Sequence, residues 1–355
     1  MTFKFSSKNT GLIGLDISST SVKLVELKPL KQGYKVVSYV VEPLPANAVN
    51  EKNLQDVEVV GEAIRRAIKR AETRTKTAAL AVPSAMVITK IITMPANLRD
   101  HEMEAQIQLE ADQYIPYPLE EINLDFQVLG PNDEQEDVVD VLLAASRSEN
   151  VEDRTAAAEI GGLNVKIVDV EPYTMETAME LIKHQIDDEG RDKTVAILDI
   201  GATMTSLSVL RDQQLIYTRE QPFGGKQLTE EIMRRYGLSY EDAGRVKRTG
   251  GLPENYEPEV LEPFKQLVVQ QTNRFLQFFF SGDKNDYVDQ IILAGGSAVI
   301  PGLAELIGER IGTPTVIADP FANVKFASHI NQQRIVDDGP ALMIACGLAL
   351  RGFDQ

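Results

Sequence analysis

The chain has 355 residues, enough for two or three domains, and 43% of its residues are hydrophobic, which is ample for sizeable cores. Its formal net charge of -17 disfavours nucleic acid and anionic lipid as main partners, because an acidic surface is repelled by both. The single cysteine, Cys346, excludes an internal disulfide and is typical of a reducing compartment, and we recognise neither a signal peptide nor a membrane-spanning stretch.

Residues 1–10 are expected to form a flexible tail, and the first folded element is a β-hairpin over residues 12–27. An apolar run reaches Asp16, a polar turn follows at residues 18–20, and a second apolar run leaves the turn. Backbone N–H groups and short hydroxyls at such a turn suit phosphate oxygens. Lys23 is placed to reach a phosphate from the departing strand. Taken alone, the segment also fits an ordinary β-hairpin.

The next segments predict a mixed α/β unit. Residues 34–41 alternate as a third strand, residues 57–70 repeat apolar positions at helical spacing, and residues 77–82 form a buried strand. The pattern changes at Pro83. Residues 83–166 predict a small α+β subdomain that interrupts the first domain, with three strands, one helix after the first strand and another after the last.

A second hairpin, over residues 194–210, repeats the first. Asp199 matches Asp16 and Thr203 matches Thr20 when the two segments are aligned. A repeat at this distance suggests two similar domains that face each other. The two carboxylates at the strand ends suit a hard cation held through its waters, because magnesium keeps part of its hydration shell.

A third turn follows a buried strand at residues 291–294, where Gly295 and Gly296 precede a helix that starts near Pro301. Glycine lets the backbone approach a ligand, and helix N-termini favour anions, so this turn predicts a phosphate or nucleoside cradle. Near the end of the chain, a helix opened by Pro340 is rich in small residues. It is either a close-packed hinge between domains or simply a buried helix.

The turns at 16–20, 199–203 and 294–297 resemble, in this order, the two phosphate turns and the adenosine turn of the actin/Hsp70/sugar-kinase superfamily. The resemblance implies an α/β fold of duplicated actin-like (ribonuclease H-like) domains around a nucleotide cleft, with ATP and Mg2+ as cofactors. The inserted subdomain resembles that of FtsA. Residues 109–126, together with the first hairpin, resemble the PilM family of type IV pilus assembly proteins. The implied division is a tail at 1–10, a first domain at 11–82, 167–193 and 338–355, an inserted subdomain at 83–166 and a second domain at 194–337.

The resemblance also implies roles for single residues. Glu171 resembles the glutamate that positions the attacking water, and is the candidate catalytic residue. Lys247 lies in a Lys-Arg-Thr segment similar to the purine clamp of Hsp70-type proteins, although Gly244 stands where that clamp has a glutamate. Ala202 replaces a Gly or Asp of the active ATPases, so the resemblance implies ATP binding with weak or absent hydrolysis. The implied nucleotide-binding residues are Asp16, Ser18, Ser19, Lys23, Asp199, Gly201, Ala202, Thr203, Gly224, Gly225, Lys247, Gly295, Gly296 and Ser297, with Asp16 and Asp199 also holding the metal.

By the same resemblance, the chain is expected to be a cytoplasmic ATP-binding scaffold of the type IV pilus assembly complex, recruited to the inner membrane by a membrane protein. The implied partner is the N-terminal cytoplasmic peptide of PilN, held between the insertion and the first domain. It would bind by strand addition or on aromatic side chains such as Tyr114, Tyr117 and Phe126. An acidic surface suits the positive charge usual beside the cytoplasmic end of membrane spans. Other proteins of the pilus platform and self-association are further implied partners.

Two other classes of function stay open. One is an active ATPase or a filament-forming protein like FtsA, and pelleting or electron microscopy with ATP would distinguish the filament former. A small-molecule kinase of the same superfamily would need an aspartate base in the cleft, and no candidate stands out beyond the two metal carboxylates.

Overall fold

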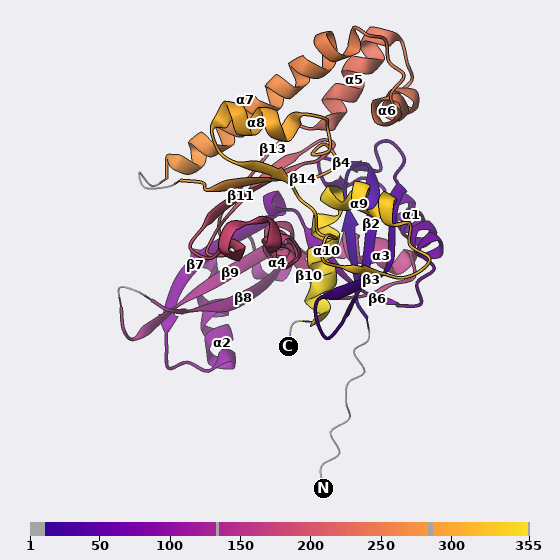
Figure 1. Ribbon diagram of the computed structural model, residues 1–355. Coiled ribbons are helices and arrows are strands. Elements are labelled where there is room, and N and C mark those ends of the chain that lie inside the picture. The colour runs from indigo at the N-terminus through magenta and orange to yellow at the C-terminus, as the bar shows by residue number, and fades with distance from the viewer. Residues whose placement is uncertain (1–10, 133–134, 283–286, 354–355) are drawn as a thin grey trace.

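The computed structural model describes residues 11–132, 135–282 and 287–353, so the expected tail at 1–10 lies outside the described residues. The described residues form two lobes, each built on its own sheet, and a smaller subdomain attached to the first lobe. In Figure 1 the second lobe lies at the top, the first lobe at the right and the inserted subdomain at the lower left.

The first lobe is built on a six-stranded sheet with the order β10 (Asn164–Val170), β6 (Thr77–Val82), β1 (Ile13–Ile17), β2 (Ser21–Pro29), β3 (Tyr34–Pro43) and β16 (Lys325–Phe326). Strands β1, β2 and β3 form an antiparallel meander, and β6 runs parallel to β1. Every residue of β1 is buried. Helix α1 (Val57–Ala71) packs on α3 (Ser148–Ile160), where a Cβ at Gly61 would lie 2.4 Å from Ile160.

The second lobe repeats this plan. Its sheet has the order β13 (Gln214–Gln221), β12 (Thr205–Arg211), β11 (Thr194–Ile200), β14 (Gln290–Ala294) and β15 (Thr315–Ile317). Strands β11, β12 and β13 are antiparallel, while β14 runs parallel to β11, as in the first lobe. The shared order confirms the predicted duplication. The α-helices of this lobe among its described residues are α5 (Gly225–Tyr236), α6 (Tyr240–Thr249), α7 (Glu262–Phe280) and α8 (Leu303–Ile311).

Two helices, α4 (Glu171–Ile182) and α10 (Met343–Leu350), pack between the two sheets and share one hydrophobic core with both. A short helix, α9 (Gln332–Asp338), precedes α10. A Cβ at Gly347 would lie 1.9 Å from the carbonyl oxygen of Thr174, and a Cβ at Gly14 would lie 1.9 Å from that of Ala345. The small residues of α10 therefore let it approach both α4 and β1 backbone to backbone, as the hinge interpretation of its sequence requires.

The inserted subdomain is a three-stranded antiparallel sheet with the order β7 (Val87–Pro95), β9 (Val138–Arg147) and β8 (Ile122–Pro131). Helix α2 (Asp100–Glu110) buries Met103 and Ile107 against it. Among the described residues, none of the helices combines the length and apolar character that a bilayer span requires.

The sheets divide the chain differently from the expected boundaries. Helix α3 and strand β10 start before residue 167, yet α3 contributes Ala157 and Ala158 to the first-lobe core and β10 pairs with β6. Strand β16 lies before residue 338, yet it pairs with β3 of the first sheet. Apolar periodicity predicts that an element is buried, but not which sheet buries it, so these boundaries could not be found from the sequence.

Candidate functional site

The two acidic turns lie face to face between the lobes. The Oγ1 of Thr203 donates a hydrogen bond of 3.0 Å to the Oγ of Ser19, although 184 residues separate them in the sequence. Asp16 lies near the end of β1, and Asp199 holds the same place in β11. Ser18 closes the first turn through its N–H, which donates to the carbonyl oxygen of Ser21 at 3.0 Å.

The residue opposite each aspartate differs between the two turns. Asp16 pairs with Lys23, whose Nζ lies 2.8 Å from its Oδ2, whereas Asp199 pairs with Ser206. Burial acts to lower the pKa of Lys23, but the adjacent Asp16 outweighs it and the pKa is raised. Burial raises the pKa of Asp199, and Lys23 offsets this only in part. Asp199 is therefore a partly buried carboxylate that faces a serine across its hairpin, where Asp16 faces a lysine.

The second turn packs against the start of α5. The N–H of Gly225 donates to the carbonyl oxygen of Gly201 at 3.0 Å, and the N–H of Lys226 donates to that of Ala202 at 2.8 Å. A Cβ at Gly224 would lie 2.6 Å from both carbonyl oxygens, so only glycine fits there. The turn thus lies beside a helix N-terminus, where the helix dipole favours anions.

The glycine turn after β14 lies against the second acidic turn. Gly295 adopts a φ of 83°, and a Cβ there would lie 2.3 Å from the Oδ1 of Asp199. Its N–H donates to the carbonyl oxygen of Pro340 at 2.7 Å, and the N–H of Ser297 donates to the carbonyl at the end of β11 at 3.1 Å. Gly296 is exposed, and a Cβ at that position would meet no atom within 4 Å. The three turns therefore form one cradle with open space above Gly296.

Lys247 adjoins the same cradle from α6. Its Nζ donates to the carbonyl oxygen of Gly225 at 3.0 Å and to the Oγ1 of Thr229 at 2.9 Å. Burial, helped by Arg248, lowers the pKa of Lys247 to about 8. The side chain is thus a partly charged cation near neutral pH, next to the glycine pair of α5.

Another partly buried lysine, Lys52, was not found from the sequence. Lys52 lies in the turn between the short strands β4 (Val49–Asn50) and β5 (Asn53–Leu54), and its Nζ contacts the carboxylates of Glu171 and, at 3.0 Å, Glu220. Burial acts to lower the pKa of Lys52, but these two carboxylates raise it. Burial raises the pKa of Glu171, the candidate catalytic residue at the start of α4. The turn around Lys52 looks like an ordinary polar loop, so no sequence signal marked it.

The donor set of the cleft fits a divalent cation held through water and phosphate oxygens. Among the described residues, no group of three or more His, Cys, Asp or Glu side chains is arranged to chelate a metal. Asp16 and Asp199 supply one carboxylate from each lobe. The Oε2 of Glu220 is buried without a hydrogen-bond partner in the described part of the chain, so it is an unsatisfied acceptor beside these carboxylates.

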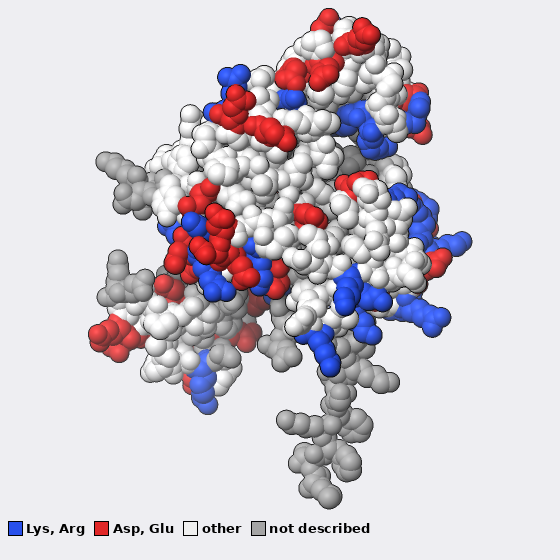
Figure 2. Space-filling model, viewed as in Figure 1, with Lys and Arg blue, Asp and Glu red and all other residues white. Residues whose placement is uncertain are grey.

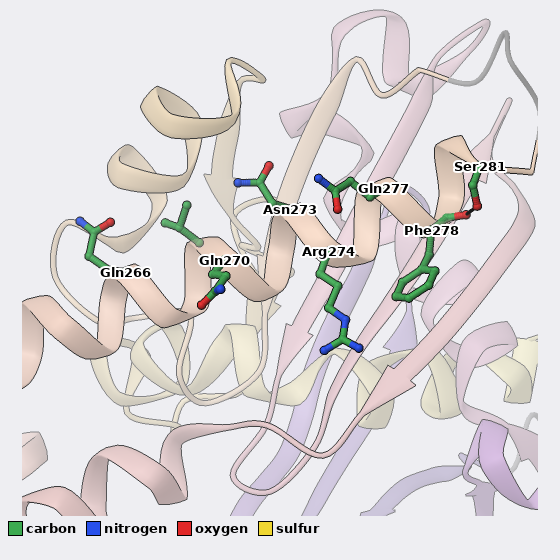
Figure 3. A pocket seen from close by; sticks show the side chains of 8 residues that line it. Gln266, Gln270, Asn273, Arg274, Gln277, Phe278 and Ser281 are labelled. Atoms are coloured by element: carbon green, nitrogen blue, oxygen red, sulfur yellow. Dashed lines mark hydrogen bonds between the residues drawn. The ribbon is translucent and has the colours of Figure 1, made fainter.

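A separate hollow of about 790 Å³ lies along the outer side of α7 (Figure 3). Arg274 is the one charged residue among the described residues that line it. The guanidinium of Arg219 stacks 3.5 Å from the ring of Phe278, one of its lining residues. This hollow has neither paired carboxylates nor a glycine turn, so it is not the predicted nucleotide site. Its lining residues are Gln266, Val269, Gln270, Asn273, Arg274, Gln277, Phe278 and Ser281.

Comparison with known proteins gives one family and several similar folds. A family described as type IV pilus assembly protein PilM matches residues 14–353. A solved structure described as the PilM-PilN type IV pilus biogenesis complex is 29% identical and superposes with a TM-score of 0.80, covering 98% of this chain and 100% of that chain.

Two more distant relatives share the fold. MreB 5 of Spiroplasma citri, solved bound to AMPPNP, is 13% identical with a TM-score of 0.50, over 96% of this chain and 95% of that chain. The cell division protein FtsA of Bacillus subtilis (strain 168) is 20% identical over 359 residues, which cover 88% of this chain and 80% of FtsA. At these identities the similarity shows the fold alone, which is the actin-like fold expected from the motifs.

Proposed function

Because the chain belongs to the family of type IV pilus assembly protein PilM, we propose that it is a nucleotide-binding scaffold whose inserted subdomain binds the cytoplasmic tail of a membrane protein. The observation that carries the nucleotide part is the 3.0 Å hydrogen bond between Ser19 and Thr203. A triphosphate can be held from both sides only where the two phosphate turns face each other, and this contact requires that they do.

The proposed nucleotide is ATP with Mg2+. The hydroxyls and N–H groups of the two turns, with Lys23, would hold the phosphates, and the glycine turn at 295–297 would hold the nucleoside. Asp16 and Asp199 would hold the metal ion, which neutralises phosphate charge when it is bound. The AMPPNP bound to MreB 5 of Spiroplasma citri supports a nucleoside triphosphate as the ligand of this fold.

We assign Glu171 as the group that would accept a proton from water at the γ-phosphate. Its carboxylate is buried and already paired with Lys52. The carboxylate would have to leave its contact with Lys52 to reach a water molecule, so hydrolysis is proposed to be slow. Nucleotide would then act mainly by bringing the two lobes together.

The proposed partner is the N-terminal cytoplasmic peptide of PilN, the protein named in the similar solved complex. Residues 87–146 of the inserted subdomain contain 13 Asp and Glu but only two Lys and Arg, so they carry most of the net charge of -17. Figure 2 shows Lys and Arg gathered on the other side of this face, over the first lobe near α1. A basic peptide would therefore be drawn to the inserted subdomain.

Two tyrosine rings of that subdomain lie against cationic side chains. The guanidinium of Arg147 lies 4.7 Å from the ring centre of Tyr117, and the Nζ of Lys90 lies 5.1 Å from that of Tyr114. Tyr114, Tyr117 and Phe126 all pack against hydrophobic clusters of the subdomain, but the two tyrosine rings also contact cations, so they are the better candidates for contact with a basic peptide. Binding to PilN would also hold the protein at the inner membrane, which is the proposed location.

Isothermal titration calorimetry tests both parts. Mg-ATP and a synthetic peptide of the PilN N-terminal segment are titrated separately into the wild-type protein at low and high salt. We expect both to bind. The affinity for the peptide should fall as the salt concentration rises, because salt screens the attraction between charges beyond about 10 Å at 0.1 M ionic strength. Absence of ATP binding refutes the nucleotide assignment, and a peptide affinity independent of salt refutes the charge argument.

A further inference from the structure

Lys52 joins acidic side chains that belong to different lobes. Its Nζ contacts Glu171 at the start of α4 and Glu220 near the end of β13. The side chains of Lys52, Glu171 and Glu220 are 18%, 10% and 7% exposed, so both ion pairs are largely shielded from water. Removing one member of such a cluster leaves an uncompensated buried charge.

The row of paired residues that contains Glu220 includes no cation. Asp199, Ser206 and Glu220 pair in one row across β11, β12 and β13, so their side chains share one face of the sheet. In the first lobe the equivalent row is Asp16, Lys23 and Val41. The first row neutralises its own aspartate, whereas the second has two carboxylates and depends on a lysine from the opposite lobe.

The turn that carries Lys52 is held in one conformation by its backbone and by a buried arginine. Glu51 and Lys52 have φ values of 45° and 67°, a left-handed backbone that costs free energy for residues other than glycine. The buried guanidinium of Arg154 donates from Nη2 to the carbonyl oxygen of Lys52 at 2.6 Å. Its Nη1 bonds to the carbonyl oxygen of Asn150 in its own helix, α3. A strained turn tied to a buried arginine fixes where the Lys52 side chain enters the cleft.

We infer that Lys52 is a positioning residue that bridges the two lobes and sets the place of Glu171 and the width of the cleft together. The inference rests on the proposed function for its nucleotide readout, but the bridge itself concerns this chain alone. Without Lys52, the two buried carboxylates repel each other, and the lobes separate until water reaches them. The charged groups that also act on the cluster are Asp16, Lys23, Arg154 and Asp199.

The first experiment measures lobe separation without nucleotide. Spin labels are placed at Lys69→Cys on α1 and Glu309→Cys on α8, both exposed sites, while the native Cys346 is buried and does not react. Electron–electron resonance distances are recorded for this protein and for the added variants Lys52→Met, Lys52→Arg and Glu220→Gln. We expect a longer and broader distance in Lys52→Met, a smaller change in Glu220→Gln, and the original distribution in Lys52→Arg, which keeps the charge.

The second experiment measures Mg-ATP affinity in the same variants without labels. Lys52→Met should bind about tenfold more weakly. Its affinity should recover as pH falls from roughly 8 to 6, because unpaired buried carboxylates take up protons in that range. Wild type and Lys52→Arg should show only the roughly twofold rise in affinity that protonation of Lys247 gives to every variant. A merely structural role for Lys52 would lower stability without this pH profile.

The outcomes separate the bridge from the proposed function. If the wild type fails to bind ATP, the nucleotide proposal is wrong, while the distance measurement still decides the bridge. If Lys52→Met leaves the distance distribution unchanged, the bridge is wrong, whatever the nucleotide does. Should Lys52→Met fail to fold, Glu220→Gln decides alone: an unchanged distance distribution in that variant overturns the inference.

Discussion

The Oγ1 of Thr203 lies 3.0 Å from the Oγ of Ser19, so the corresponding turns of the two duplicated domains touch across the cleft. The hydroxyl of Thr203 donates this hydrogen bond and the hydroxyl of Ser19 accepts it. Phosphate oxygens entering between the turns would replace this single bond with hydrogen bonds to both hydroxyls. The contact therefore places hydroxyls of both turns within reach of one phosphate group.

Gly296→Ala should weaken nucleotide binding without weakening the fold. A methyl group at Gly296 meets no protein atom within 4 Å, so it costs the folded state little, but it enters the space where the nucleoside is proposed to lie. We expect at least a tenfold loss of Mg-ATP affinity, about 1.4 kcal/mol, and an unchanged melting temperature. Gly244→Ala on α6, which also meets no atom, is the matched control and should keep full affinity. Equal affinity in both variants would place the nucleoside elsewhere.

Asp199→Asn should weaken Mg-ATP binding while raising stability. Burial raises the pKa of Asp199, which means that the folded protein disfavours its charge. A neutral amide at this position should therefore increase the free energy of unfolding near pH 7. Loss of the metal carboxylate should cost roughly tenfold in Mg-ATP affinity. Calorimetry and thermal denaturation measure the two effects.

Glu42→Gln is the control with the opposite stability effect. Glu42 is buried too, but Arg66 and Arg70 outweigh its burial and lower its pKa, so its charge stabilises the folded state above the unfolded pKa. This variant should be less stable and should bind Mg-ATP as the wild type does. If Asp199→Asn bound Mg-ATP equally well, the metal assignment would be refuted.

ATP binding near pH 8 should take up protons through Lys247. Burial lowers the pKa of Lys247 to about 8, so close to half of the side chains are uncharged there. The negative charge of a bound nucleotide raises that pKa again and draws a proton from the buffer. The binding enthalpy should therefore depend on the ionisation enthalpy of the buffer at pH 8, but not roughly two pH units lower, where the lysine is already charged. A dependence that persists in Lys247→Met would assign the proton to another group.

Removing residues 87–146 should abolish peptide binding and leave ATP binding intact. Val87 and Ser146 are paired neighbours on β7 and β9, and the Oγ of Ser146 lies 2.9 Å from the carbonyl oxygen of Met86, so a short glycine linker can rejoin the chain. The cut keeps α3 and β10, which belong to the first lobe. Calorimetry with the PilN peptide and with Mg-ATP measures the two affinities separately. Retained peptide binding would exclude the inserted subdomain as the partner site.

Local patterns in the sequence were enough to predict the duplicated sheets and the three turns. Each acidic turn lies between two apolar runs only a few residues away, and Gly295 marks a backbone position that other residues cannot take. Lys52 could not be predicted in this way. It meets Glu171 and Glu220 across 119 and 168 residues of sequence, and nothing in its turn distinguishes it from a solvated loop.

A crystal structure of the wild-type protein with AMPPNP and Mg2+ tests the central claim most directly. The account predicts triphosphate density between the turns of Ser19 and Thr203, with the metal ion near Asp16 and Asp199 and the adenosine over Gly296. Nucleotide bound elsewhere, for instance in the hollow along α7, or a cleft that stays closed by the Ser19–Thr203 hydrogen bond at saturating nucleotide, would contradict it.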